Sequence, residues 1–483
     1  MRADRTPGHL TAGRRRVLGR VGRVSHRAAL EPWFVPFALV NADAVGLVPI
    51  LLPIVAVRHG VGHVGLVMGA FSLGAIAAPV AGNLADHYRA HRSLATACAA
   101  LCAASLWLFP LAAAPLQPLL GLANGAGFAG AVTVANLLIV ERHPRAEWNT
   151  RLGWLETALS FGQGGGLVLA AWLSGLTARN GLLIAALVPV AAIPLSLTLI
   201  PRMSGTAAAA RPAPAAHPGA GASPGAGTGP VAAASAVGGA SAVGVGGASA
   251  VGPRAGHHFA SAGQVGEWGP ASPSRVRPLQ QRTLADLMRS ARLLRGPFGW
   301  MLAAWIPAYA GTAIIFALYP VLFSRAFGVA PRASAVAFAI IVFVSLPLFI
   351  VAGRASQRRG PAATLAVALA ARVVLLALLA AAAAVGHVPA VVPLAAFGGV
   401  MFAWSFLSVA SPGLTAQLVP GAEGDAQGAL NAASGLAGLV GSVVGGLAAG
   451  LWGYPAALSI GAGAVVVGLS LFAAKVLPVT GRP

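Results

Sequence analysis

The chain has 483 residues, of which 57% are hydrophobic and 9% are charged, and its formal net charge is +21. Because soluble globular domains carry about 25% charged residues, this composition excludes an ordinary soluble enzyme. A strongly basic chain can bind nucleic acid, but the basic residues of this chain are placed as expected for a protein at a membrane surface, as shown below.

Residues 1–31 are rich in arginine and contain no apolar run long enough for the core of a signal peptide. The run Arg14-Arg15-Arg16 resembles a twin-arginine signal, but further arginines stand where the apolar region of such a signal would follow. We therefore interpret residues 1–31 as an uncleaved cytoplasmic tail.

Twelve apolar runs follow, each of roughly the 20 residues that an α-helix needs to cross a bilayer. They predict an all-α membrane protein with twelve transmembrane helices in two six-helix halves, at residues 32–200 and 297–478. The predicted spans are 33–57, 61–84, 93–114, 119–140, 152–176, 181–200, 298–323, 333–352, 362–385, 390–411, 426–450 and 455–477.

Only two carboxylates fall inside these spans, Asp43 in the first and Glu156 in the fifth. Asp43 lies about 15 Å along its helix, near the bilayer midplane, where a lone carboxylate is costly and binds a proton readily. We predict that Asp43 faces the bundle interior and couples transport to protons. The alternative is a structural acid paired with a polar neighbour such as Asn124. Asn41, on the same helix, is a candidate for the substrate cavity.

Glu156 begins a polar stripe that continues with Ser160 and Gln163 on one face of the fifth helix. This placement makes Glu156 a second candidate for proton coupling and Gln163 a candidate for the substrate cavity. The alternative is that Glu156 pairs at the membrane surface with Arg151 or Arg142.

Two features indicate a tandem duplication. The turn predicted after the second span, Gly82-Asn83-Leu84-Ala85-Asp86-His87-Tyr88-Arg89-Ala90-His91-Arg92, has a basic counterpart in the second half at 353–360. The small residues Gly153, Gly162, Gly166, Ala170 and Ala171 recur with the same spacing at 428, 437, 441, 445 and 446. A repeated unit of helices is typical of two transporter halves.

The segment 82–92 resembles the loop between the second and third helices of the major facilitator superfamily, G-x-L-A-D-R-x-G-R-K. The residues that match are Gly82, Leu84, Ala85, Asp86 and Arg92, whereas His87 and the pair Arg89-Ala90 depart from the pattern. The resemblance implies a conformational switch in this loop, formed by Gly82, Leu84, Asp86, Arg89 and Arg92.

The fifth helix is similar to the antiporter signature of that family, G-x8-G-x3-G-P-x2-G-G. The matching residues are Gly153, Gly162 and Gly166, while Leu167 replaces the proline and Ala170-Ala171 replace the last two glycines. The resemblance favours an antiporter. Close packing of helices through small residues explains the same glycines without any transport direction.

Residues 201–296 are predicted to form a cytoplasmic loop between the halves. Residues 204–274 of this loop are mainly Ala, Gly, Pro, Ser and Val. Because few of these side chains are large and apolar, the segment cannot form a core, and we expect it to be disordered. Residues 283–295 have one apolar face and several arginines, which predicts a helix lying on the inner membrane surface.

The basic residues fix the orientation of the chain. Nearly all of the 32 lie in the tails, in the central loop or in turns on one side of the membrane. This asymmetry predicts that both termini, including a short C-tail at 479–483, are cytoplasmic and that the basic residues meet anionic lipids rather than nucleic acid. The exceptions are Arg58, Arg179, Arg325 and Arg332 on the opposite side and Arg372 within the ninth span.

The second half supplies further candidates for the substrate cavity. On the seventh and tenth helices, aromatic and polar residues recur every three or four positions, which favours a bulky, partly apolar solute. Arg372 lies on the ninth helix, which is peripheral in the family that the chain resembles, so we expect it to snorkel or make a structural contact. The cavity candidates are Trp305, Tyr309, Thr312, Phe316, Met401, Trp404 and Ser408.

Cys98 and Cys102 are the only cysteines, one helical turn apart without histidine or aspartate beside them, so they predict packing residues rather than a metal site. We expect no cofactor and no enzymatic chemistry. The interpretation that follows is a monomeric, proton-coupled antiporter in a bacterial plasma membrane that exports hydrophobic or amphipathic small molecules. Two alternatives remain, an uptake symporter on the same fold and a non-transporting membrane sensor or scaffold.

Overall fold

A computed structural model describes residues 30–143, 148–202, 296–419 and 423–480. Within these ranges the regular structure is entirely helical, which confirms the predicted fold class. The basic tail before residue 30, the segment 204–274, the amphipathic stretch 283–295 and the last three residues lie outside the described residues.

The described helices before residue 203 form the N-terminal half. Its first span is one continuous helical segment in which α2 passes through a π-helical turn η1 into α3. The helices of this half are α2 Phe34–Asn41, η1 Ala42–Leu47, α3 Val48–Ala56, η2 Val57–His59, α4 Val61–Leu73, η3 Gly74–Ala77, α5 Ala78–Tyr88, α6 His91–Leu108, η4 Phe109–Leu111, η5 Ala114–Leu116, α7 Gln117–Arg142, α8 Trp148–Leu173, α9 Ala178–Ala185 and α10 Leu187–Leu199.

The described helices after residue 295 form the C-terminal half. The longest, α16, contains two helices that meet at Gly453, whose φ of 84° breaks the helical path before Pro455. The helices of this half are α12 Pro297–Phe327, α13 Pro331–Arg359, α14 Pro361–Val385, α15 Val391–Leu418, α16 Glu423–Lys475 and α17 Leu477–Thr480.

Ten helical segments in the described part of the chain are long and apolar enough to cross a membrane. That count takes 426–475 as one segment and does not include α8. Because Gly453 divides α16 and α8 has 26 residues, a helix lies over each of the twelve predicted ranges, although α8 is not apolar enough to be counted as a span.

The turn predicted at residues 82–92 is shorter than expected. Residues 82–88 continue α5, and the chain reverses only at Arg89, which has a left-handed backbone conformation with φ 49°, before α6 begins at His91. The corresponding stretch in the second half is also helical, because α13 continues through Arg359 and the turn lies at Gly360. In both places the helix extends beyond the apolar run, since sequence hydropathy marks where the membrane core ends and not where the helix ends.

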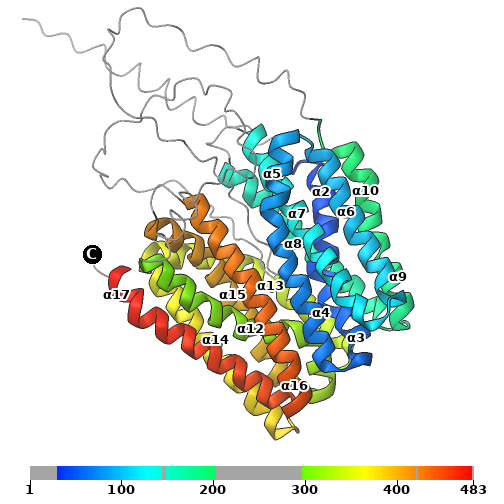
Figure 1. The fold of residues 1–483 in the computed structure, drawn as a ribbon. Helices are drawn as coiled ribbons and strands as arrows, with labels where there is room; N and C mark the ends of the chain where they lie inside the picture. Colours follow the sequence, from blue (N-terminus) through cyan, green and yellow to red (C-terminus); the bar gives the residue numbers. More distant parts are fainter. Residues whose placement is uncertain (1–29, 144–147, 203–295, 420–422, 481–483) are drawn as a thin grey trace, which may run out of the picture.

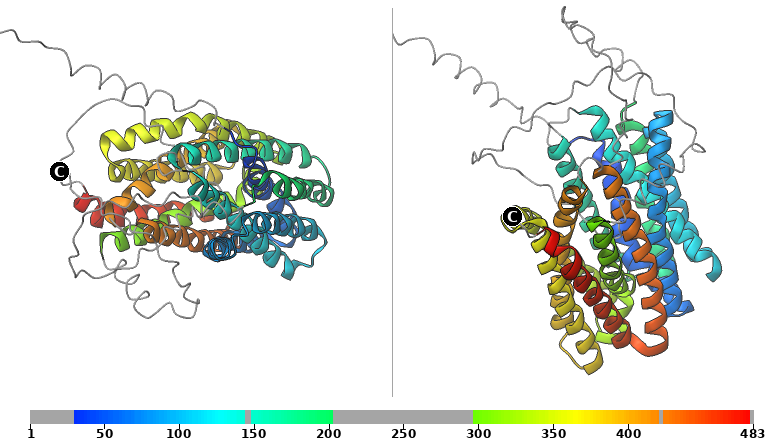
Figure 2. Two further views of the ribbon diagram at one scale, coloured as in Figure 1. Left: turned by 90° about the horizontal axis from the view of Figure 1, so that it is seen from above. Right: turned by 60° about the vertical axis from the view of Figure 1, so that its left-hand side comes forward.

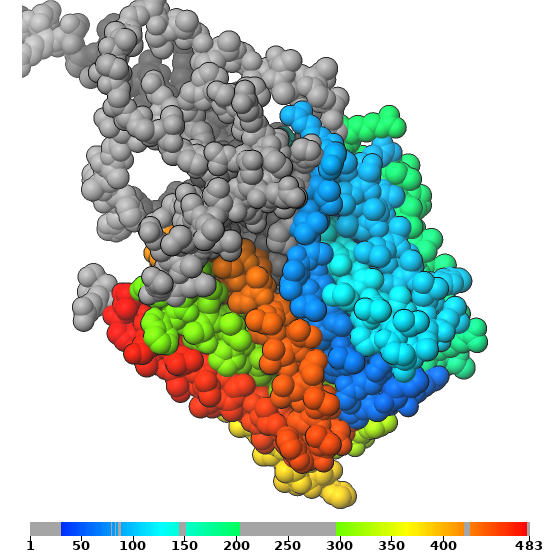
Figure 3. Space-filling model, viewed as in Figure 1, coloured from blue at the N-terminus to red at the C-terminus, as the bar shows by residue number. Residues whose placement is uncertain are grey.

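The two halves lie side by side, each a bundle of helices of similar direction (Figure 1). α4 packs along α16, α3 contacts α12, and α8 contacts α13, so the first, second and fifth spans carry the interface with the second half. Seen from above, the helices of the second half lie mainly toward the left and those of the first half toward the right (Figure 2, left). At the surface, the first part of α16 and α4 lie next to each other (Figure 3).

Small residues bring these helices into backbone contact. A Cβ placed on Gly446 of α16 would lie 2.7 Å from the Cα of Gly65 on α4, and one placed on Gly65 would overlap the carbonyl of Ser442. Within the N-terminal half, a Cβ on Gly46 would lie 2.7 Å from the Cα of Gly166. Gly162 and Gly166 of the fifth helix therefore pack closely against the first helix, which is the alternative to an antiporter role that the sequence also offers.

Candidate functional site

A cavity lies between the two halves, where α4 faces α12, α15 and α16. The space between atoms there is about 420 Å³, which includes space open to solvent, and only a small part of it is wide enough for a water molecule. Most of its lining is apolar or aromatic, and hydroxyl groups supply most of its polar atoms. The lining residues are Met68, Ser72, Tyr309, Thr312, Ala313, Phe316, Ala317, Trp404, Gly438 and Ser442.

The aromatic wall of this cavity comes from the seventh and tenth spans. Tyr309 and Trp404 meet edge to face with ring centroids 5.9 Å apart, and Trp305 lies 5.9 Å from Tyr309 on the other side. Phe316 joins the wall to a cluster behind it, with its ring centroid 5.8 Å from that of Phe397. Four predicted cavity residues, Tyr309, Thr312, Phe316 and Trp404, thus line one cavity.

The other three candidates from this half lie beside the cavity rather than on its lining. Trp305 is 5% exposed and donates its Nε1 hydrogen to Ser434 Oγ at 2.8 Å, which links α12 to α16. Met401 is buried in α15. Ser408 is half-buried and donates to the carbonyl of Ser405 within the same helix. These contacts are those of packing residues.

Asp43 is fully buried inside the N-terminal half. It stands in the π-helical turn η1, and its Oδ2 accepts a hydrogen bond of 3.1 Å from the Nδ2 of Asn124 on α7. Asn124 also contacts Cys102 of α6 through the backbone carbonyl of that cysteine. The pairing with Asn124 is the structural alternative that the sequence offers. Asp43 Oδ1 is buried without a hydrogen-bond partner among the described residues, so the pairing satisfies the carboxylate only in part.

Asn41 and Gln163 occupy the contact between α2 and α8. The Nδ2 of Asn41 donates to the carbonyl of Leu159 at 2.6 Å. Gln163 is 1% exposed, and neither polar atom of its side chain has a hydrogen-bond partner among the described residues. Glu156, one helical turn earlier than Ser160 on the same face, is half-buried. Arg151, one of its two expected surface partners, forms an ion pair with Glu31 at 2.8 Å.

Of the two roles expected for Arg372, snorkelling and a structural contact, the structure shows a buried contact. It is 1% exposed, and its Nη1 donates to Thr312 Oγ1 at 3.0 Å. Its guanidinium carbon lies 5.2 Å from the centroid of the Trp404 ring. A helix at the edge of the bundle can still send a long side chain inward, and Arg372 reaches two residues that line the cavity. The sequence contains a signal for this, since no other basic residue stands in the middle of a span.

The predicted switch residues lie at the end of α5 and the start of α6. Leu84 and Arg89 are exposed, Arg92 is half-buried, and a Cβ on Gly82 would lie 3.4 Å from Thr133 of α7. The side chain of Asp86 lies outside the described residues. Close by in the chain, the buried His91 places its Nε2 3.2 Å from a carboxylate oxygen of Glu141.

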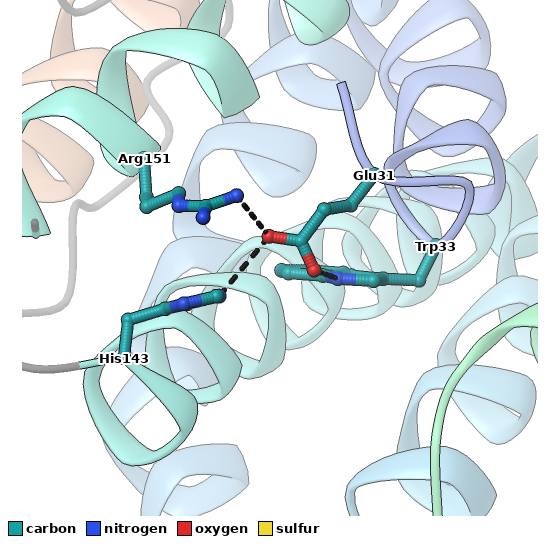
Figure 4. A network of polar contacts seen from close by, with 4 residues as sticks. All are labelled: Glu31, Trp33, His143 and Arg151. Atoms are coloured by element: carbon teal, nitrogen blue, oxygen red, sulfur yellow. Dashed lines mark hydrogen bonds and ion pairs between the residues drawn. The ribbon is translucent and has the colours of Figure 1, made fainter. Parts of the chain in front are cut away.

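A second polar network ties together the ends of three helices in the N-terminal half (Figure 4). The carboxylate of Glu31 accepts from Trp33 Nε1 at 2.6 Å and from Arg151 at 2.8 Å, and lies 3.0 Å from His143 Nε2. It thereby connects the start of the first span to the end of α7 and the start of α8. No group of three or more His, Cys, Asp or Glu side chains able to hold a metal ion occurs among the described residues.

Solved structures with the same fold are transporters by their titles. The chain is similar to a D-xylose-proton symporter, with a TM-score of 0.64 and 13% identity over 93% of this chain and 98% of that one. It is similar to the nucleoside transporter NupG, with a TM-score of 0.63 and 13% identity over 92% and 97% of the two chains.

A third similar structure is a bacterial homolog of the human lysosomal transporter Spinster, with a TM-score of 0.59 and 13% identity over 94% and 97% of the two chains. At these identities the likeness shows the fold. No curated protein sequence matches the chain. A sequence model of the Major Facilitator Superfamily does match, over residues 35–411. Because that match spans most of the chain and the fold agrees, this protein belongs to the Major Facilitator Superfamily and is a multi-pass membrane transporter rather than an enzyme.

Proposed function

We propose that the protein is a proton-coupled secondary transporter that exports hydrophobic or amphipathic small molecules by alternating access. The observation that carries the proposal is the cavity between the halves, with Met68 and Ser72 on one side and Tyr309, Phe316 and Trp404 on the other. A site lined by both halves changes its access when they rock against each other. Its aromatic wall suits a bulky apolar solute better than a sugar, which needs more amide and charged partners.

The proton would bind at Asp43. A buried carboxylate is stable when neutral, whereas its ionised form needs water or a fuller set of donors than the single amide of Asn124 provides. Asp43 is not part of the cavity lining, so its effect on the solute would be transmitted through the π-helical turn of the first helix. The π-helical turn that holds Asp43 connects α2 to α3, and α3 contacts α12 of the other half. Such turns are frequent at functional sites.

We propose export by antiport for two reasons: α8 resembles the antiporter signature in its glycines, and the wall of the cavity is apolar. The opposite direction has support of its own, because one structure with the same fold is titled a D-xylose-proton symporter. We therefore keep proton-coupled uptake as the second candidate. In either case we propose that the end of the bundle bearing the tails faces the cytoplasm of a bacterial cell, as the distribution of its arginines suggests.

The test is solute flux in proteoliposomes with an imposed pH gradient, using a solute chosen by a thermal-shift screen of the purified protein. We expect the wild type to move solute against the direction of proton flow if it is an exporter, and along with the protons if it is an uptake symporter. A flux that does not depend on the pH gradient would contradict both the proton-coupled exporter and the proton-coupled symporter.

The first prediction concerns the two acids within the spans. Asp43→Asn preserves the hydrogen-bonding shape beside Asn124 but cannot exchange a proton, so gradient-driven flux should be abolished while the folded protein still binds a neutral solute. Glu156→Gln, which changes a half-buried acid nearer the helix end, is the matched comparison and should have the milder effect. Full gradient-driven flux in Asp43→Asn would remove Asp43 as the coupling site, and a dead Glu156→Gln would move that role to α8.

A further inference from the structure

Arg372 is a buried cation directly behind the wall of the cavity, in contact with two of its lining residues. It lies in the middle of α14, is 1% exposed and reaches Thr312 and Trp404, both of which line the cavity. The hydroxyl hydrogen of Thr312 goes to the carbonyl of Ala308 at 3.1 Å, so its oxygen is turned to accept from the arginine. The guanidinium is thereby held behind the cavity lining by one neutral hydrogen bond and one aromatic face.

This wall offers hydrogen-bond donors in excess of acceptors. Nε and Nη2 of Arg372 are buried without a partner among the described residues, and so is Nε1 of Trp404. A guanidinium has five N–H donors in a fork that matches a carboxylate, sulfonate or phosphate. Unpaired donors on a buried cation destabilise the protein unless something negative offsets them.

The C-terminal half has almost no carboxylate that could neutralise Arg372. From residue 297 to the end of the chain, the only acidic residues in the sequence are Glu423 and Asp425, at the start of α16. In the N-terminal half, Asp43 is bonded to Asn124, and Glu31 and Glu141 are in contact with His143, Arg151 and His91. None of the ion pairs seen among the described residues includes Arg372.

We propose that Arg372 binds the anionic group of the transported solute, which would be an organic monoanion with one carboxylate, sulfonate or phosphate diester on an apolar or aromatic body. The charged group would sit against the guanidinium, while the body would lie between Tyr309, Phe316 and Met68. This inference rests on the proposed transport through this cavity and narrows its solutes from amphipathic compounds in general to amphipathic anions.

The experiment uses the full chain in lipid nanodiscs and measures ligand-induced thermal shifts and dissociation constants without any proton gradient. The probes are naphthoate and naphthalenesulfonate, with naphthamide as the neutral compound of matching shape. We expect the wild type to bind both anions more tightly than the amide. Arg372→Gln should weaken anion binding about tenfold or more and leave amide binding within about twofold.

Three further variants keep the result interpretable. Arg372→Met fills the same space without charge and serves if the glutamine variant does not fold, because an apolar side chain in place of a buried charge is often neutral or stabilising. Arg372→Lys should retain part of the anion preference, since it keeps the charge and loses the fork. Arg332→Gln removes an exposed arginine at the start of α13 and should leave the preference unchanged.

Equal binding of anions and amide by the wild type, or an anion preference that survives in Arg372→Gln and Arg372→Met, would overturn the proposal. Loss of thermal stability in these variants with the preference intact would assign Arg372 a structural role. Because binding is measured without a gradient, the result is independent of proton coupling. The two proposals can therefore fail separately. If the Arg372 variants lose the anion preference and Asp43→Asn still shows gradient-driven flux, Arg372 binds the anion and Asp43 is not the proton-coupling residue.

Discussion

Asp43 and Arg372 are buried ionisable residues that lie where the first, third and fourth spans of their halves meet. Asp43 stands on the first span of its half and meets the fourth span through Asn124, beside the third. Arg372 stands on the third span of its half and meets the first through Thr312 and the fourth through Trp404. Burying a charge costs several kcal/mol unless hydrogen bonds and opposite charges offset it. Neither charge is fully offset within the protein, which is the expected state of groups that exchange a proton or bind a ligand.

Trp305 gives a test of what holds the wall of the cavity in place. Its Nε1 donates to Ser434 Oγ, and the indole packs between α12 and α16. Trp305→Phe removes this hydrogen bond and part of the ring, so the free energy of unfolding should fall by about 1 kcal/mol or somewhat more. The measurement is the midpoint of denaturant-induced unfolding in detergent.

The control for Trp305→Phe is the same substitution at an exposed tryptophan. Trp172, on α8, is 58% exposed, and Trp172→Phe should change the unfolding free energy by less than about 0.5 kcal/mol. Equal midpoints for Trp305→Phe and Trp172→Phe would show that the bond to Ser434 does not stabilise the contact between α12 and α16.

At the scale of helices, hydropathy predicted where the spans lie but not which face of a span is turned inward. α14 shows why. Its buried residues Leu365, Leu369, Leu376 and Leu379 lie on the same face as Arg372, yet the lipid-facing residues are equally apolar. Because a membrane helix is apolar on both sides, the pattern that separates inside from outside in a soluble helix is absent. The position of Arg372 in the middle of a span hints at an inward direction, but the residues that it meets follow from packing against other helices.

Positions that depend on spacing within one span were easier to predict. The seventh helix carries Tyr309, Thr312 and Phe316 at helical intervals, and all three line the cavity. Asp43 and Asn124 were paired as an alternative because both are polar residues deep in apolar spans, and polar groups there need partners. Contacts between residues with no such constraint, such as Trp305 with Ser434, were not predicted.

A substitution at Gly65 tests whether the contact between α4 and α16 sets the balance between the conformations of the transporter. A methyl group on Gly65 would overlap the carbonyl of Ser442, so Gly65→Ala should separate these helices at the end of α4 near Val61. The expected result is a shift toward a state open at that end. The measurement is labelling of Ser72→Cys, a cavity position, by an impermeant thiol reagent added from that side, in a background without Cys98 and Cys102.

The matched control is Gly165→Ala on α8, because a Cβ on Gly165 would have no atom within 4 Å. It should label at the same rate as the parent, while Gly65→Ala should label several times faster. Unchanged labelling in Gly65→Ala would mean that the small residues of α4 and α16 serve static packing and do not set the balance between conformations.

At the scale of the whole molecule, direct contacts hold the two halves together. α4 packs on α16, α8 on α13 and α3 on α12, and the cavity lies among these elements. The peptide connection between the halves, residues 203–295, lies outside the described residues, and the sequence predicts a flexible tether for most of it. If the halves are oriented by their contacts, the length of the connection should matter little.

Deleting residues 215–250 removes about half of the low-complexity segment and tests this directly. The deletion leaves roughly 55 residues between the halves, which can extend well beyond 100 Å and so cannot restrain their rocking. We therefore expect membrane insertion, thermal stability and flux within about twofold of the wild type. We use a replacement of the same residues by a glycine–serine sequence of equal length to separate an effect of length from an effect of sequence.

If the deletion variant inserts normally but loses flux and the replacement variant does not, the length of the tether limits the transport cycle. Lost flux in both would give these residues a specific partner or contact of their own.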